Sequence, residues 1–123
     1  MKKIEVLAQD VKEEINQLQL FRSGWANDIR EGWYFGMSGA KEILFELYEV
    51  SGSIILALQQ IQEGRYRDKM AMILVKNKLQ KLVDSETFKE FETMGRKGMC
   101  RVVTSGTKYH IRVMFEDLKI LTE

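Results

Sequence analysis

The feature that most constrains this 123-residue sequence is the complete absence of proline. Average usage of about 5% would supply roughly six prolines in a chain of this length. Proline breaks helices because it lacks a backbone N–H and because its ring clashes with the preceding turn. Its absence removes the commonest helix breaker, and we therefore expect long helices to dominate the fold.

The composition is that of an ordinary folded domain, with 45% hydrophobic and 30% charged residues. A chain of this length can bury a real core, and we expect residues 1–123 to form a single domain. The longest apolar run, residues 70–75, is far shorter than the roughly 20 residues of a membrane span. We expect no membrane span and no signal peptide, and the single Cys100 favours a reducing, cytoplasmic compartment.

The N-terminal segment carries a stripe of apolar residues that predicts a helix. Their spacings of three and four are typical of a helix that packs against another helix. We expect this helix over about residues 3–21, with a break at Ser23 and Gly24. The next segment, 25–39, contains three glycines, so any helix capped there by Asp28 is expected to be short. The stripe consists of Ile4, Leu7, Val11, Ile15 and Leu18.

The middle of the chain predicts two longer helices. Apolar residues at helical spacing indicate one over about residues 39–62, with Ser38 as its N-cap and Gly64 at its end. The small residues at 51–53 are expected to bend or split this helix. The other, over about residues 65–83, is apolar nearly all round at its centre, which predicts burial on more than one side.

A short helix is expected after these two. Asp84 or Ser85 can cap its N-terminus, and Gly95 can cap its C-terminus. Phe88 and Phe91 would form its apolar side.

After Gly98 the apolar pattern changes from helical to alternating. Apolar residues lie two apart on either side of Ser105 and Gly106, which predicts an antiparallel hairpin with strands over about residues 99–104 and 107–115. One face of this hairpin is then apolar and the other basic. A lone hairpin is marginal in water, so it is expected to lie on the helices or to pair with another strand, from the C-terminal residues or from a partner chain.

Together these patterns predict an α+β fold. Four to five helices are expected to fill most of residues 3–94, and the C-terminal β-hairpin and final segment occupy about 98–121. We find no internal repeat and no low-complexity tract.

The net charge of +1 conceals a partition of charge along the chain. Residues 1–63 carry 6 basic and 10 acidic side chains, residues 64–114 carry 12 and 5, and residues 115–123 carry 1 and 3. Such asymmetry points to a polyanionic partner. An acidic half and a basic half that dock on each other within the fold would explain it equally well.

The stretch from residue 96 to residue 112 contains no acidic residue. On the predicted hairpin its cations share an exposed face, and such a face can lie along nucleic-acid phosphates. An exposed hairpin face can also be basic for solubility alone. The candidate polyanion-binding residues are Arg96, Lys97, Arg101, Lys108, His110 and Arg112, with a second cluster of Arg65, Lys69 and Lys76.

The aromatic residues at 25–35 have three interpretations: they fill the core, they form a protein interface, or they stack on bases. The apolar stripe of the first helix covers little more than two heptads, so it is expected to pack within a bundle or across a homodimer. The candidate interface residues are Trp25, Trp33, Tyr34, Ile4, Leu7, Val11, Ile15 and Leu18.

The sequence offers no arrangement for catalysis. One histidine and one cysteine do not build a typical zinc site, and on the predicted hairpin His110 and Cys100 point to opposite faces. Glu42, Glu46 and Glu49 form an acidic stripe that could hold a divalent cation, although a solvated helix face is the simpler interpretation. We therefore expect no catalytic residue, metal or cofactor.

The sequence thus predicts a small, non-enzymatic binding or regulatory protein that is homo-oligomeric. Its basic C-terminal surface would contact nucleic acid or another polyanion. The alternative is a protein–protein interaction module, an inhibitor or adaptor, that binds another protein and no nucleic acid.

Overall fold

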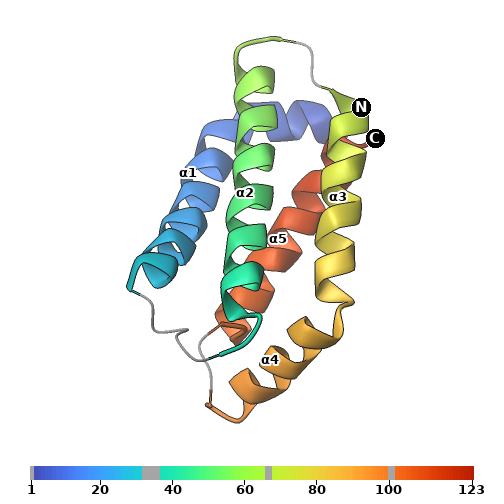
Figure 1. Cartoon of the computed structure of the whole chain (residues 1–123). Coiled ribbons are helices and arrows are strands. Elements are labelled where there is room, and N and C mark those ends of the chain that lie inside the picture. Colours follow the sequence, from blue (N-terminus) through green and yellow to red (C-terminus); the bar gives the residue numbers. More distant parts are fainter. Residues whose placement is uncertain (1, 32–36, 66–67, 100–101) are drawn as a thin grey trace.

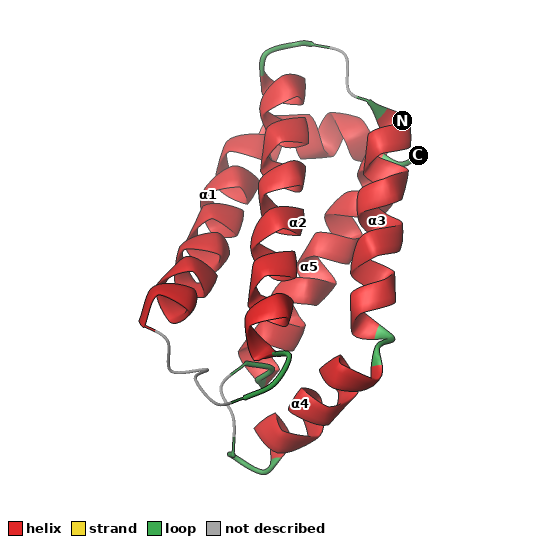
Figure 2. Cartoon of the chain, in the orientation of Figure 1, coloured by secondary structure: helices red, strands yellow, loops and turns green. Residues whose placement is uncertain are grey.

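The structure is a computed structural model that describes the backbone of residues 2–31, 37–65, 68–99 and 102–123, and the side chains of these residues from Val11 onward. Over these ranges the chain is all-helical and contains no β-strand (Figures 1 and 2), so the predicted α+β fold is wrong. The helices are α1 (Lys2–Glu31), α2 (Ala40–Gln62), α3 (Lys69–Val83), α4 (Glu86–Arg96) and α5 (Ser105–Leu121).

Four helices form an up-and-down bundle, and the fifth crosses one of its ends (Figure 1). The long helix α2 lies at the centre and packs against α1, α3 and α5. The helix α5 also contacts α1 and α3, which closes the bundle. The short α4 joins α3 to α5 at the end of the bundle opposite the chain termini.

The core is organised around α2 because this helix is buried on several sides. Burying a leucine or isoleucine side chain contributes about 1.5–3 kcal/mol, so the α2 side chains are a large share of the driving force. The inner faces of α1 and α5 supply the facing residues. The fully buried side chains include Leu44, Leu47, Ile54 and Leu58 of α2, Leu18 of α1, and Met114, Leu118 and Leu121 of α5.

The first helix is longer than predicted. It continues to Glu31 through Ser23 and Gly24, which lie on its exposed side. Two weak helix formers cost at most about 1 kcal/mol each. Burial of Phe21 and Trp25 on the inner face offsets that cost.

The second helix is continuous where a bend or split was expected. The hydroxyls of Ser51 and Ser53 donate hydrogen bonds to the carbonyl oxygens of Tyr48 and Glu49, at 2.8 and 3.2 Å, so they do not compete with the helix. The N-cap is Gly39 and not Ser38.

Gly64 follows the C-cap of α2 with a φ of 72°. Its position there confirms the predicted end of the helix.

The third helix is the least buried of the bundle helices. It begins at Lys69, where the Asp68 carboxylate caps it by accepting the Ala71 N–H at 3.1 Å. Met72 and Leu79 are its buried residues, so the predicted burial on more than one side is wrong. Because α3 packs on the bundle through one face, apolar residues on its other side have no partner within the described chain.

The fourth helix begins as predicted at Ser85, whose hydroxyl accepts the Phe88 N–H at 3.1 Å. It runs past Gly95 to Arg96. The left-handed residue that follows is Gly98, with a φ of 71°. Phe88 and Phe91 are buried on its inner side.

The predicted hairpin is wrong because its second strand region lies within α5. The Thr104 hydroxyl accepts the Thr107 N–H at 3.2 Å and caps this helix, which places Ser105 and Gly106 in its first turn rather than in a β-turn. The buried residues Thr107, Ile111, Met114, Leu118 and Leu121 follow spacings of four and three. Burial of that stripe against α1, α2 and α3 outweighs the alternating pattern of the exposed and half-buried residues.

Gly39 provides a test of how α2 is started. It has a φ of 86°, and a Cβ there would lie 2.6 Å from the Thr87 Cγ2 atom of α4. We expect Gly39→Ala to lower the free energy of unfolding by about 1–3 kcal/mol, as for other strained positions. Chemical denaturation measures it.

Gly64→Ala is the matched control, because Gly64 also has a positive φ but a Cβ there would meet open space. Gly64→Ala should lower the free energy of unfolding by less than Gly39→Ala does. Adding Thr87→Ser to Gly39→Ala removes the methyl group that the new Cβ would meet, and should restore part of the lost stability. Equal losses of unfolding free energy in Gly39→Ala and Gly64→Ala would contradict the close approach of the start of α2 to α4.

Candidate functional site

A basic corner forms where the end of α4 meets the start of α5. We use this name for the surface made by Lys89, Arg96, Lys97, Lys108 and Arg112. A pocket of about 280 Å³ opens there, and its lining includes Arg96 and Lys108 together with Ser105 of the first turn of α5. The corner lies at the end of the bundle that α4 crosses (Figure 1).

Glu92 is the carboxylate that lines this pocket, and cations surround it. The Lys108 Nζ atom lies 2.9 Å from the Glu92 Oε2 atom and bridges α4 to α5. The hydrogen bond from Lys108 lowers the pKa of Glu92 below its ordinary value, aided by the charges of Lys108, Arg96 and Lys89. The cations around Glu92 therefore stabilise its ionised form.

The remaining cations of the corner stay exposed to solvent. Arg96 lies in the last turn of α4, and its Nη2 atom donates to the Thr93 hydroxyl at 3.4 Å. Lys97 follows as the C-cap. Arg112 lies one turn after Lys108 on α5, with its guanidinium 5.3 Å from the Tyr109 ring centre. These side chains can reach a ligand without unfolding any element.

The structure places His110 away from this surface. Its ring stacks on Phe21 of α1 with a centroid distance of 3.6 Å, and Trp25 meets it edge-on at 6.0 Å. Burial lowers the pKa of His110 below its ordinary value. His110 therefore joins α5 to α1 rather than facing solvent. Arg101 lies outside the described residues.

The second predicted cluster is separate from the basic corner. Arg65 lies in the α2–α3 loop and pairs with Glu63. Lys69 begins α3 at the end of the bundle opposite α4, and Lys76 follows two turns later. The structure thus brings Arg96 and Lys108 to one pocket, with Lys97 next to Arg96 in the chain and Arg112 one turn after Lys108. Arg65 and Lys69 lie at the other end of the bundle.

The predicted interface residues are mostly engaged within the chain. Trp25, Val11, Ile15 and Leu18 are all buried in the core. Ile4 and Leu7 lie in the part of α1 before Val11, where side chains are not described, and Trp33 and Tyr34 lie outside the described residues.

No arrangement for metal binding is found among the described residues. They contain no group of three or more histidine, cysteine, aspartate or glutamate side chains placed to hold an ion. Within the acidic stripe, Glu46 and Glu49 pair with Lys78 of α3, at 3.5 and 2.9 Å. Cys100 lies outside the described residues. No helix in the described part of the chain has the length and apolar character to cross a membrane.

Sequence reasoning missed one buried titratable residue, Asp117 of α5, which is 4% exposed. Burial, followed by the charge and hydrogen bond of Glu14 on α1 and the charge of Glu116, raises the pKa of Asp117 to about 8. Buried oxygens of Asp117 and Glu14 find no other partner in the described chain. Protonation of Asp117 would remove the charge repulsion between these two carboxyl groups of α1 and α5. The signal in the sequence was an acidic residue, Asp117, on the same side of the helix as the apolar stripe at positions 111, 114, 118 and 121.

Comparison of the chain with protein-family models, with curated proteins and with solved structures finds no match.

The buried acid pair predicts how stability depends on pH. Because the pKa of Asp117 is raised above its value in the unfolded chain, its contribution is fully present below about pH 4 and is lost as pH rises through about 8. Asp117→Asn keeps the shape and removes this titration. We expect the variant to be more stable than the natural chain at about pH 8.5 and to show a smaller loss between pH 5 and 8.5, measured by urea denaturation.

Glu116→Gln serves as the control for that comparison. Glu116 is exposed and contributes the smallest of the causes, so the pH dependence should be nearly unchanged. An equal loss of stability with rising pH in the natural chain and in Asp117→Asn would contradict the raised pKa of Asp117.

Proposed function

We propose that this protein is a small, non-enzymatic binding protein whose basic corner contacts the phosphates of a nucleic acid. The observation that carries the proposal is the setting of Glu92, a single pocket carboxylate surrounded by Lys89, Arg96 and Lys108. Lys97 and Arg112 extend the same surface. A linear polyanion can engage several such cations at once, which a small anion cannot do.

The arrangement of the cations favours contact with phosphates rather than recognition of bases. The cations of the corner are exposed side chains on and beside α4 and α5, which core packing holds in place. Contacts of this kind position a nucleic acid without reading its sequence. The described aromatic residue at the corner, Tyr109, is exposed beside Arg112 and offers a surface on which a base can stack.

Glu92 occupies the place of a phosphate in the free protein. A phosphate that approaches Lys108 would compete with the Glu92 carboxylate for the hydrogen bond of Lys108, and Arg96 lines the same pocket. Backbone N–H groups in the first turn of α5 add donors to the same pocket. Removal of the Glu92 charge should therefore strengthen binding, whereas removal of the cations should weaken it.

We further propose that the protein works in a reducing compartment. The support is its single cysteine, Cys100, which has no second cysteine in the chain to pair with.

The test is a titration of labelled single-stranded DNA and RNA at several salt concentrations. If about four phosphates are contacted, the slope of log K against log salt should be about −3, at 0.7–0.9 per phosphate. The double variant Lys108→Glu and Arg112→Glu should reduce the steepness of this slope by about 2 and weaken binding at low salt. Glu92→Gln should bind more tightly than the natural chain.

Lys12→Glu is the matched control, because Lys12 is an exposed lysine on α1, away from the basic corner. It changes the net charge without touching the corner and should leave the salt slope unchanged. Unmeasurable binding at low salt would contradict the proposal. Equal losses of nucleic-acid affinity in Lys12→Glu and in Lys108→Glu would contradict it as well.

A further inference from the structure

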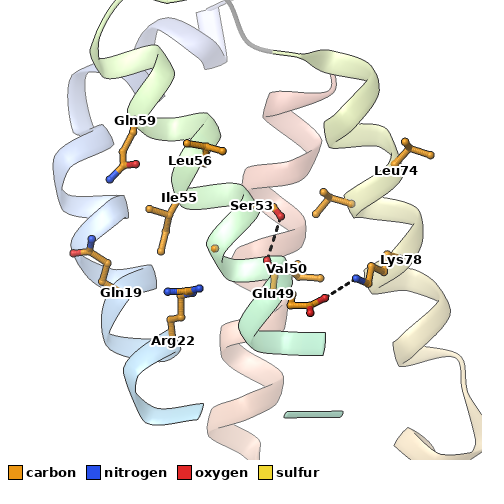
Figure 3. Close-up of a pocket in the computed structure, with 12 residues that line it drawn as sticks. Gln19, Arg22, Glu49, Val50, Ser53, Ile55, Leu56, Gln59, Leu74 and Lys78 are labelled. Carbon is orange, nitrogen blue, oxygen red and sulfur yellow. Dashed lines mark hydrogen bonds and ion pairs between the residues drawn. The ribbon is translucent and has the colours of Figure 1, made fainter. Parts of the chain in front are cut away.

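A second surface, at the opposite side of α2 from α5, exposes large apolar side chains. A groove of about 770 Å³ runs along α2 between α1 and α3, and its lining extends from Glu49 to Gln59 (Figure 3). Leu56 of α2 and Leu74 of α3 line the groove and are 55% and 66% exposed. Contiguous exposed apolar surface marks protein-binding sites more often than isolated apolar residues do, and these two leucines line one open groove.

Arg22 of α1 supplies a fixed positive charge beside this apolar wall (Figure 3). Its guanidinium carbon lies 3.7 Å from the Tyr48 ring centre, and its Nε atom donates to the Tyr48 carbonyl oxygen at 3.2 Å. Gly52 makes room for it, because a Cβ there would lie 3.0 Å from the Arg22 Nε and Nη2 atoms. These contacts hold the side chain in place without neutralising it.

The two cations that line the groove differ in whether they form an ion pair. Lys78, on the α3 side, pairs with Glu46 and Glu49 of α2. Among the described residues, no carboxylate forms an ion pair with Arg22. A partner that covers the leucines would therefore complement the groove best if it placed a carboxylate at Arg22.

We propose that this groove binds an amphipathic helix of another protein, with leucine-type side chains on one face and an acidic residue beside them. The lining spans about 15 Å along α2 at 1.5 Å per residue, enough for anchors at positions i, i+4 and i+7 of a docked helix. The open shape does not suit a small molecule, since small-molecule sites enclose most of their ligand. The proposal rests on the groove alone and is independent of the basic corner.

The partner is another protein rather than a second copy of this chain. Apolar faces of α1, α2 and α5 that could fill the groove are already buried in the core. Of the exposed large apolar residues on α2 and α3, Leu56 and Leu74 line the groove, whereas Phe45 and Met70 do not. One further exposed apolar residue on each helix does not make the continuous apolar face that a second copy would need to fill the groove.

The experiment selects from a displayed library of helical peptides of about 18 residues, randomised on one face, long enough to hold a helix on binding. Affinities of the selected peptides are then measured by fluorescence anisotropy. We expect Leu56→Asp and Leu74→Asp to weaken binding at least about tenfold, as loss of a central anchor does. Both leucines are exposed, so unfolding midpoints should change little.

Leu20→Asp is the matched control, because Leu20 is 73% exposed on α1 and does not line the groove. It should not change peptide affinity. Replacing the acidic residue of a selected peptide by its amide should weaken binding to the natural chain but not to Arg22→Gln, which isolates the pair.

Three outcomes would overturn the proposal. One is selection that yields no peptide sensitive to Leu56→Asp. Another is a set of selected peptides that shows no preference for an acidic residue, or whose binding is abolished by Lys108→Glu at the basic corner. The third is a dimer, detected by light scattering, that Leu56→Asp dissociates and Leu20→Asp does not, since a second copy would then occupy the groove.

Discussion

Burial of α2 on several sides is the constraint on which the rest of the structure depends. Leu44, Leu47, Ile54 and Leu58 are fully buried along its length, so other helices must cover it on all but one side. The helices α1, α3 and α5 provide that cover. With no proline in the chain, each can run long enough to do so. The short α4 then connects α3 to α5 across the end of the bundle.

Both proposed surfaces follow from this arrangement. The groove exists because α1 and α3 flank α2 without covering its outer side, which leaves Leu56 and Leu74 exposed. The basic corner exists because the chain between α4 and α5 carries cations and no acid. Glu92 and Lys108 join the two helices there. One surface is apolar with a fixed arginine and the other is cationic, so the two suit partners of different chemistry.

The sequence predicted the elements whose signals are local. The stripe through Val11, Ile15 and Leu18 indicated α1, and Ser85 and Gly64 marked a start and an end correctly. The C-terminal segment was misassigned because Tyr109, Ile111, Val113 and Phe115 alternate as in a strand. The competing stripe of Ile111, Met114, Leu118 and Leu121 becomes decisive only when α1, α2 and α3 are present to cover it.

The positions of the predicted site residues also depend in part on contacts between helices, which the sequence pattern does not show. Two predicted cations, Arg96 and Lys108, do meet at one pocket, on helices that follow each other in the chain. The inward stacking of His110, however, depends on Phe21, which lies 89 residues away in sequence. The exposure of Leu74 and the packing of Arg22 on Tyr48 likewise depend on how helices meet. Pattern along one segment does not contain that information.

On the two proposals above, a nucleic acid and a protein helix bind separate faces of one bundle. Amide chemical shifts of the ¹⁵N-labelled chain, followed while a single-stranded oligonucleotide is added, test it most directly. The account predicts shifts confined to α4 and the first half of α5, with the amides around Arg22, Leu56 and Leu74 unmoved. Shifts centred on the groove, or spread evenly over the bundle, would contradict it.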